Sequence, residues 1–134
     1  MSKLDIFKAL SNETRLSILK WLKEPEKYFP PQGLHIPDGD DFSNSVCVGS
    51  ICEKTNISQS TISHYLDMLQ RAGLLESRRF GKWTYYRRNE KTFKNLQNLS
   101  VVNFKSLRQE YSCLLLMIKY LYLAIYKFNK ITNY

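Results

Sequence analysis

The segment Ile57–Leu74, ISQSTISHYLDMLQRAGL, constrains the fold more than any other part of the chain. Apolar residues recur in it at intervals of three and four, which predicts a helix with one apolar stripe. The stripe consists of Ile62, Tyr65, Leu66 and Leu69. Ser58 suits the N-cap because its hydroxyl can accept a hydrogen bond from a backbone N–H of the first turn. Gly73 suits the left-handed conformation that ends many helices, so the sequence predicts both ends of this helix.

The other face of this predicted helix is polar. It carries Gln59, Ser60, Ser63, His64, Asp67, Gln70 and Arg71. Small hydroxyl groups and an amide at the first turn can bond phosphates and base edges in a DNA major groove, and a helix N-terminus favours an anion. We therefore expect the start of this helix to bind DNA through Ser58, Gln59, Ser60, Thr61, Ser63 and His64. For His64 the alternative is a solvated polar side chain.

A shorter helix is expected just before this one, from about Val48 to Lys54, with Ile51 and Cys52 turned inward. Residues 55–58, TNIS, then break the helical pattern. Two helices joined by a turn of about three or four residues have the spacing of a helix-turn-helix.

After Gly73 the pattern changes to the alternation and aromatic content that are typical of strands. Residues 74–80 form the first expected strand, Gly81-Lys82 the turn, and residues 83–88 the return strand. Five cations lie on this ribbon, namely Arg78, Arg79, Lys82, Arg87 and Arg88. We expect this "wing" to lie along the sugar–phosphate backbone of DNA, with Arg78, Arg79, Lys82 and Arg87 supplying affinity for phosphates.

The order of these elements, together with Ala9–Leu16, ALSNETRL, resembles the ArsR-type winged helix-turn-helix repressors of bacteria. The pattern of that family is A-L-S-x-x-T-R-L, then L-S-x-S-x-x-S-x-H-L-x-x-L-x-x-A-G-L, then a basic wing. The resemblance covers about residues 1–100. It implies a mainly α fold with a small β-hairpin, which is a winged helix-turn-helix, followed here by an extra C-terminal helix. It also implies a DNA-binding transcriptional regulator whose first helix packs against the last family helix across a dimer.

Composition agrees with a nucleic-acid partner. The chain has 134 residues, a net charge of +8 and a pI near 9.4, which suits a polyanion such as DNA, RNA or an acidic membrane. The charge is uneven, because residues 46–89 carry seven Lys and Arg against three Asp and Glu, whereas residues 23–45 carry two against five. The N-terminus lacks the pattern of a secretory signal, so we expect a cytoplasmic protein.

Two helices are expected at the start of the chain, Lys3–Leu10 and then a helix that Ser11 caps and that ends near Lys23. The second helix has more apolar residues than one core stripe needs, and the surplus could meet another subunit. Residues 23–45 read as a loop insertion in the domain 1–100, since four prolines and two glycines argue against regular structure. Asp38, Asp40 and Asp41 lie in this insertion near His35. They form either a solvated acidic loop that shields nothing, or a site for an effector or partner.

A further helix is expected over Glu90–Ser100, capped by Asn89, and residues 101–134 form an apolar arm. The run Leu114–Tyr126 is short for a membrane span and Lys119 interrupts it, so a membrane partner is not expected. Its apolar residues surround the helix, which favours burial in a homodimer interface. An arm lying in a membrane interface is the alternative.

The sequence gives little support for a metal site or a catalytic site. Metal-sensing members of the resembled family carry C-V-C and an acid where this chain has Cys47-Val48-Gly49-Ser50. Three interpretations of the cysteines remain open. Cys47 and Cys52 are small buried residues, or Cys47 binds a metal together with His35 or an Asp of the loop. In the third interpretation the thiols form a redox switch with Cys113. We expect no resident metal or cofactor. Ser60, His64 and Asp67 lie on one helix without a cleft, and no catalytic motif is present, so we do not expect an enzyme.

We therefore expect a dimeric regulator of transcription, a repressor that binds double-stranded DNA and is released by an unknown signal. The alternative is a winged-helix module for protein interaction, whose apolar tail binds another protein or a membrane surface.

Overall fold

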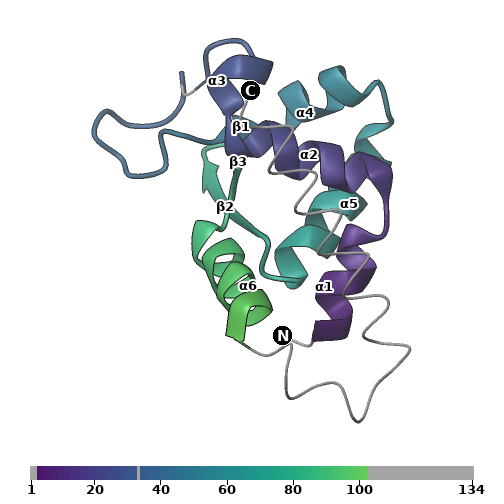
Figure 1. Cartoon of the computed structure of the whole chain (residues 1–134). Coiled ribbons are helices and arrows are strands. Elements are labelled where there is room, and N and C mark those ends of the chain that lie inside the picture. The colour runs from purple at the N-terminus through teal and green to yellow at the C-terminus, as the bar shows by residue number, and fades with distance from the viewer. Residues whose placement is uncertain (1–2, 33, 103–134) are drawn as a thin grey trace. The chain divides into compact units, whose positions relative to one another are not determined.

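The computed structural model describes residues 3–32 and 34–102, and Figure 1 shows their helices and strands. Over this part of the chain the helices are α1 (Lys3–Leu10), α2 (Glu13–Lys23), α3 (Pro25–Tyr28), α4 (Val48–Thr55), α5 (Gln59–Arg71) and α6 (Glu90–Val102). The strands are β1 (Val46–Cys47), β2 (Leu75–Phe80) and β3 (Trp83–Arg88). The predicted winged helix-turn-helix, mainly α with a small β element, is confirmed.

Both predicted ends of α5 are confirmed. The Ser58 hydroxyl accepts a hydrogen bond from the backbone N–H of Thr61, and Gly73 has a φ of 70° beyond the C-terminus. The turn ahead of α5 depends on Asn56, whose φ of 53° lies in the left-handed region that a short polar side chain tolerates. This residue ends α4 and lets the chain turn directly into α5.

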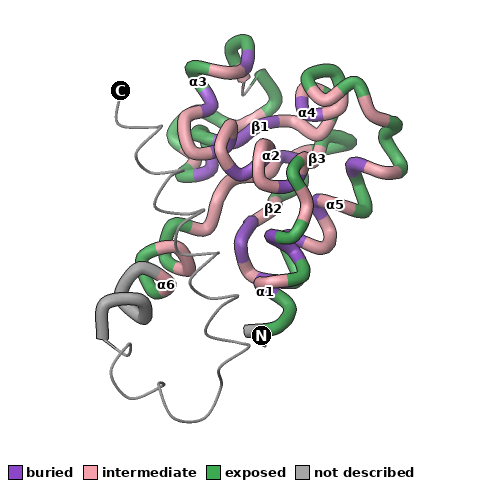
Figure 2. Tube along the Cα trace, turned by 45° about the vertical axis from the view of Figure 1, so that its right-hand side comes forward, coloured by how far each residue is buried: buried purple, intermediate pink, exposed green. Residues whose placement is uncertain are grey.

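Most buried residues lie on α1, α2, α4, α5 and the strands that these helices contact (Figure 2). Ile62, Leu66 and Leu69 of α5 are fully buried, as the predicted stripe requires, and so is Ile51 of α4. α2 adds Ile18, Leu19 and Leu22. Burial of each such side chain contributes about 1.5–3 kcal/mol relative to exposure. This apolar contact, rather than intrinsic helix propensity, fixes α5 on the rest of the motif.

Arg15 joins α1, α2 and α5. Its side chain is buried, and its Nε donates to the carbonyl of Ala9 at 2.6 Å while Nη2 donates to that of Lys8 at 2.9 Å. These two carbonyls belong to the last turn of α1, where backbone acceptors lack partners within the helix. The guanidinium also lies 5.2 Å from the ring centre of Tyr65. The arginine of the sequence ALSNETRL is therefore a structural residue.

The sheet has three antiparallel strands in the order β1-β3-β2, where the sequence predicted a two-stranded hairpin. Val46 pairs with Tyr86 and Cys47 with Tyr85. Because side chains alternate across a strand, Val46, Leu75 and Tyr86 lie on one face, and this core face packs on the helices. The outer face carries Cys47, Glu76, Arg78, Phe80, Trp83, Tyr85 and Arg87.

Two predictions near the N-terminus are wrong. Ser11 was expected to cap the second helix, but Asn12 is the N-cap, and its carboxamide oxygen accepts from the N–H of Arg15. The hydroxyl of Ser11 instead donates to the carbonyl of Lys8 at 2.8 Å. The insertion was expected to lack regular structure, but Pro25–Tyr28 forms α3. Pro25 stands at the first helical position, where proline is tolerated because its missing N–H has no helical partner.

The chain divides into two compact units, Met1–Thr92 and Phe93–Tyr134, and most of α6 belongs to the second. The helix predicted over Glu90–Ser100 is confirmed as α6, and the carboxamide of Asn89 accepts from the N–H of Thr92. Most of the predicted arm, residues 103–134, lies outside the described residues. None of the helices described here is both long and apolar enough to cross a bilayer.

Candidate nucleic-acid interface

The polar face of α5 is exposed at its N-terminal end. Gln59, Ser60, Ser63 and His64 are exposed there, opposite the buried Ile62 and Leu66. Ser58 and Thr61 are joined by a contact of 2.8 Å between their hydroxyl oxygens, and the Ser60 hydroxyl lies 3.2 Å from that of Ser58. The structure thus brings the N-cap Ser58 and the five predicted site residues of α5 together, around a helix end that favours anions.

α4 is fixed against α2 and α3 through Lys54. Its ammonium lies over three aromatic rings, 5.1 Å from the centre of Trp21 and 5.6 Å from those of Tyr28 and Phe29. Cation–π contacts of this kind contribute about 0.5–1 kcal/mol at exposed sites. Since Tyr28 and Phe29 lie in the insertion, this segment helps to position the first helix of the helix-turn-helix.

The wing cations do not form one group. By strand alternation, Arg79 lies on the same face of the sheet as Leu75, whereas Arg78 and Arg87 lie on the outer face. Arg79 is exposed and its Nε donates to the carbonyl of Gly81 at 2.9 Å. Lys82 is exposed at the turn. The predicted set of wing contacts is therefore split between two faces.

The insertion covers the outer face of the sheet. Its anchor is Phe42, which is only 2% exposed and lies against the rings and cations of that face. The ring centre of Phe42 is 4.8 Å from the guanidinium carbon of Arg78, 4.4 Å from that of Arg87 and 6.4 Å from the ring centre of Phe80. A second contact lies nearer the turn, where the rings of His35 and Trp83 stack at 4.8 Å with an angle of 2° between their planes.

Acidic side chains of the insertion bind Arg78, one of the two outer-face arginines. Nη1 of Arg78 lies 2.7 Å from a carboxylate oxygen of Asp40 and 3.0 Å from one of Asp41. Hydrogen bonding to Arg78 and its positive charge hold the pKa of Asp41 below its ordinary value. The expectation of an acidic loop that shields nothing is therefore wrong.

Arg87, the second outer-face arginine, is also bound within the protein. Its Nη1 donates to the backbone carbonyl of Asp41 at 2.7 Å, and its Nε donates to the Glu76 carboxylate at 2.8 Å. Arg88, on the other face, makes a bidentate ion pair with Glu90 at 2.6 and 2.8 Å. Sequence reasoning missed these pairings.

The cysteines adjoin the insertion. The backbone N–H of Cys47 donates to the side-chain oxygen of Gln32 at 3.0 Å. Cys47 and Cys52 are half-buried free thiols, and burial, followed by the charge of Cys47, raises the pKa of Cys52. His35, one expected partner of Cys47 in a metal site, stacks on Trp83. Within residues 3–32 and 34–102 no three His, Cys, Asp or Glu side chains are close enough together to hold a metal ion.

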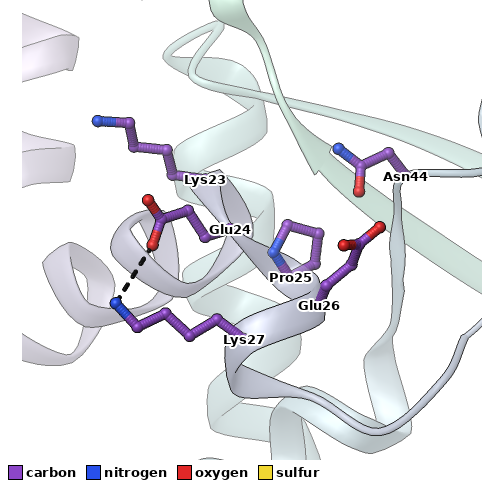
Figure 3. A pocket seen from close by; sticks show the side chains of 6 residues that line it. All are labelled: Lys23, Glu24, Pro25, Glu26, Lys27 and Asn44. Carbon is purple, nitrogen blue, oxygen red and sulfur yellow. Dashed lines mark ion pairs between the residues drawn. The ribbon is translucent and has the colours of Figure 1, made fainter. Parts of the chain in front are cut away.

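Two hollows flank α3, and neither lies on α5. One, of about 380 Å³, is lined by Lys23, Glu24, Pro25, Glu26, Lys27 and Asn44. Figure 3 shows its side chains, with Lys27 paired to Glu24 at 3.6 Å and Asn44 on the opposite side. The other, of about 330 Å³, lies between Phe29–Gln32 and Ser43–Ser45. Both hollows are lined by residues of the insertion, and Glu26 and Lys27 of the first are exposed.

Comparison with known proteins agrees with this geometry. The sequence profile described as "Bacterial regulatory protein, arsR family" matches residues 42–77, which run from the end of the insertion through α4 and α5 into β2. An uncharacterized HTH-type transcriptional regulator of Bacillus subtilis, YbzH, is 47% identical over 97 residues, which are 72% of this chain and 92% of the relative.

This chain belongs to the ArsR family. The transcriptional repressor SdpR of Bacillus subtilis is 34% identical over 85 residues, which cover 63% of this chain and 73% of that protein. The solution structure of Mb0332 from Mycobacterium bovis, a homodimeric winged helix-turn-helix DNA-binding domain, aligns with a TM-score of 0.50 at 27% identity. The alignment covers 81% of this chain and 83% of the Mb0332 domain. The ArsR-family protein is thus a DNA-binding transcriptional regulator, and its family is one of regulators, not of enzymes.

Proposed function

We propose that this ArsR-family protein is a repressor that binds its operator as a homodimer in the cytoplasm. Each α5 enters the major groove of one half-site, and a twofold dimer spans half-sites about 34 Å apart. The observation that carries this proposal is the exposed polar start of α5, which stands opposite a fully buried apolar stripe. Occupancy of an operator beside a promoter then blocks transcription until a signal weakens binding.

The proposed contacts divide into two kinds. Gln59, Ser60, Thr61, Ser63 and His64 discriminate bases, and the N-cap residue Ser58 bonds the DNA backbone beside them. Arg79 and Lys82 supply affinity that does not depend on sequence, because phosphates attract any exposed cation. Arg78 and Arg87 belong to the same proposed set, but they reach phosphates only if the insertion releases them.

Dimerisation is supported by two observations. Leu4 of α1 is 59% exposed, which leaves a large apolar side chain for a second copy to cover. The related Mb0332 domain of Mycobacterium bovis is homodimeric. We further propose that residues 1–100 form the DNA-binding domain and that residues 101–134 serve as a dimerisation arm. The mass of the full chain and of a chain ending at residue 100, measured in solution, tests this assignment.

The test of the function is an electrophoretic mobility assay of the full chain on the DNA upstream of its own gene. A duplex with the same bases in shuffled order is the control, and both are run at two salt concentrations. A repressor of this kind binds the upstream duplex more tightly at both concentrations, and both affinities fall as salt rises. Equal binding of the two duplexes would show that the protein does not recognise a DNA sequence. No binding of either duplex would show that DNA is not its partner.

A further inference from the structure

The turn Pro37–Phe42, which we name the acidic turn, occupies Arg78 with the same chemistry that a DNA phosphate would use. We propose that the acidic turn is a built-in competitor of DNA, which holds the free protein in a state of lowered affinity and must leave Arg78 when the wing meets the DNA backbone. This inference rests on the proposed role of the wing in DNA binding. The insertion is then a regulatory part of the protein.

The acidic turn is held in place by its own bonds. The N–H of Asp40 donates to the carbonyl of Pro37 at 3.1 Å, and the N–H of Phe42 donates to the Asp40 carboxylate at 2.8 Å. Gly39 has a φ of 82°, a conformation that glycine adopts without steric cost. With Phe42 buried against the sheet, the carboxylates of Asp40 and Asp41 are positioned in advance.

The competition is direct because both carboxylates accept from one nitrogen, Nη1 of Arg78. Carboxylates and phosphates are alternative acceptors for the same guanidinium donors. Around the outer face, three carboxylates, those of Glu76, Asp40 and Asp41, lie against the two guanidinium groups of Arg78 and Arg87. A phosphate that approaches Arg78 therefore meets two carboxylates that already bind this arginine.

The contacts are also weak enough to open. The side chains of Arg78 and Asp41 are 42% and 73% exposed, so their ion pair is screened by water and salt, whereas the side chain of Asp40 is 22% exposed. Breaking the pair with Asp41 costs little, and a phosphate is an alternative acceptor for Arg78 in place of both carboxylates. DNA binding and departure of the acidic turn are thereby coupled, and anything that holds the turn closed lowers the affinity for DNA.

The test compares two double variants of equal charge. Asp40→Asn with Asp41→Asn removes the carboxylates but keeps a side-chain oxygen at residue 40 for the N–H of Phe42. Glu26→Gln with Asp38→Asn is the matched control, because both residues are exposed in the same insertion and neither is ion-paired with Arg78 or Arg87 in the structure described here. Binding to the upstream duplex and to a mixed-sequence duplex is measured by fluorescence anisotropy over a range of salt.

We expect the first variant to bind both duplexes about 3- to 10-fold more tightly than the control variant does. Its salt dependence should steepen by about one unit of slope, because Arg78 then releases a counterion when it meets a phosphate. If both variants gained the same affinity relative to the wild type, the change in net charge alone would explain the effect, and the proposal would be overturned. Weaker binding by the first variant would mean that the acidic turn orients Arg78 for DNA, which also overturns it.

Arg78→Gln separates failure of this inference from failure of the proposed function. In the Asp40→Asn, Asp41→Asn background, Arg78→Gln should abolish the extra affinity, whereas in the wild-type background it should change little. Weaker binding in the wild type, with no extra gain from the Asn pair, would show that Arg78 already contacts DNA and that the turn does not compete. No effect of Arg78→Gln in either background would remove Arg78 from the interface altogether. Circular dichroism checks that every variant is folded.

Discussion

The N-terminal turn of α5 and the outer face of the wing are both rich in groups that can bind DNA. The groups of α5 are exposed, whereas those of the wing are bound within the protein. On α5, Gln59, Ser63 and His64 are exposed and the turn is capped from within by Ser58. On the wing, Arg78 and Arg87 already bind acidic groups and the ring of Phe42. A basic residue that the sequence predicts to bind phosphates can therefore already be bound by carboxylates of the same protein.

The largest expected effect concerns the anchor of the outer face. Phe42→Ala removes a fully buried ring, so we expect a loss of about 3–5 kcal/mol in the free energy of unfolding, measured with urea. Leu34→Ala, at a side chain of the same insertion that is 92% exposed, should change it by less than about 0.5 kcal/mol. A small loss for Phe42→Ala would show that the insertion only rests on the wing, and the contrast between the two regions would then disappear.

The next effect concerns base recognition by α5. Gln59→Ala should weaken binding to the upstream duplex by about 1–3 kcal/mol and barely change binding to a shuffled duplex. Gln70→Ala is the matched control, because Gln70 is an exposed residue of the same type near the other end of α5. An equal loss on both duplexes would identify Gln59 as a backbone contact instead.

A smaller effect is expected at the turn of the wing. Lys82→Ala should lower the salt dependence of binding by about one unit of slope, since one fewer phosphate is neutralised. Lys27→Ala, at an exposed residue of α3, should leave the slope as it is. If the slope of the Lys82 variant matched that of the wild type, the wing would not lie on phosphates at this point, and only α5 would remain in the proposed interface.

The smallest effect is electrostatic. The pKa of Asp41 lies below its ordinary value of 3.8 because Arg78 stabilises the carboxylate. A lowered pKa means that the contact stabilises the folded protein at pH values above 3.8, and that this contribution is lost as the pH falls through the pKa of the folded state. Carbon-detected NMR titration should give a lower value in the wild type than in Arg78→Gln. Identical values in the two proteins would argue against the ion pair in solution.

Local patterns predicted the elements that carry the proposed site. The stripe of α5, the cap at Ser58, the stop at Gly73 and the turn at Gly81 each depend on residues within a few positions of one another. Strand β1 could not be predicted, because its two residues are too few to show the alternation of apolar and polar side chains that indicates a strand. Ser11 was chosen as the cap where the structure uses Asn12, because either side chain can accept an N–H of the first turn.

The pairing of the acidic turn with the wing could not be predicted in this way. Asp40 and Arg78 are 38 residues apart, and nothing in their local sequence indicates contact. Grouping the wing cations by sequence also ignored strand alternation, which puts the neighbours Arg78 and Arg79 on opposite faces. The opposite charges of residues 23–45 and 46–89 are a signal in the sequence that agrees with this pairing, but they were not used to predict it.

Hydrogen exchange of the full chain, with and without the upstream duplex, tests the central claim most directly. The claim is that the polar start of α5 lies against DNA and that the acidic turn leaves the wing when it does. We expect the backbone amides of residues 59–64 and 79–82 to exchange more slowly in the complex, and those of residues 38–42 to exchange faster. Unchanged exchange over residues 59–64 in a saturated complex would contradict it.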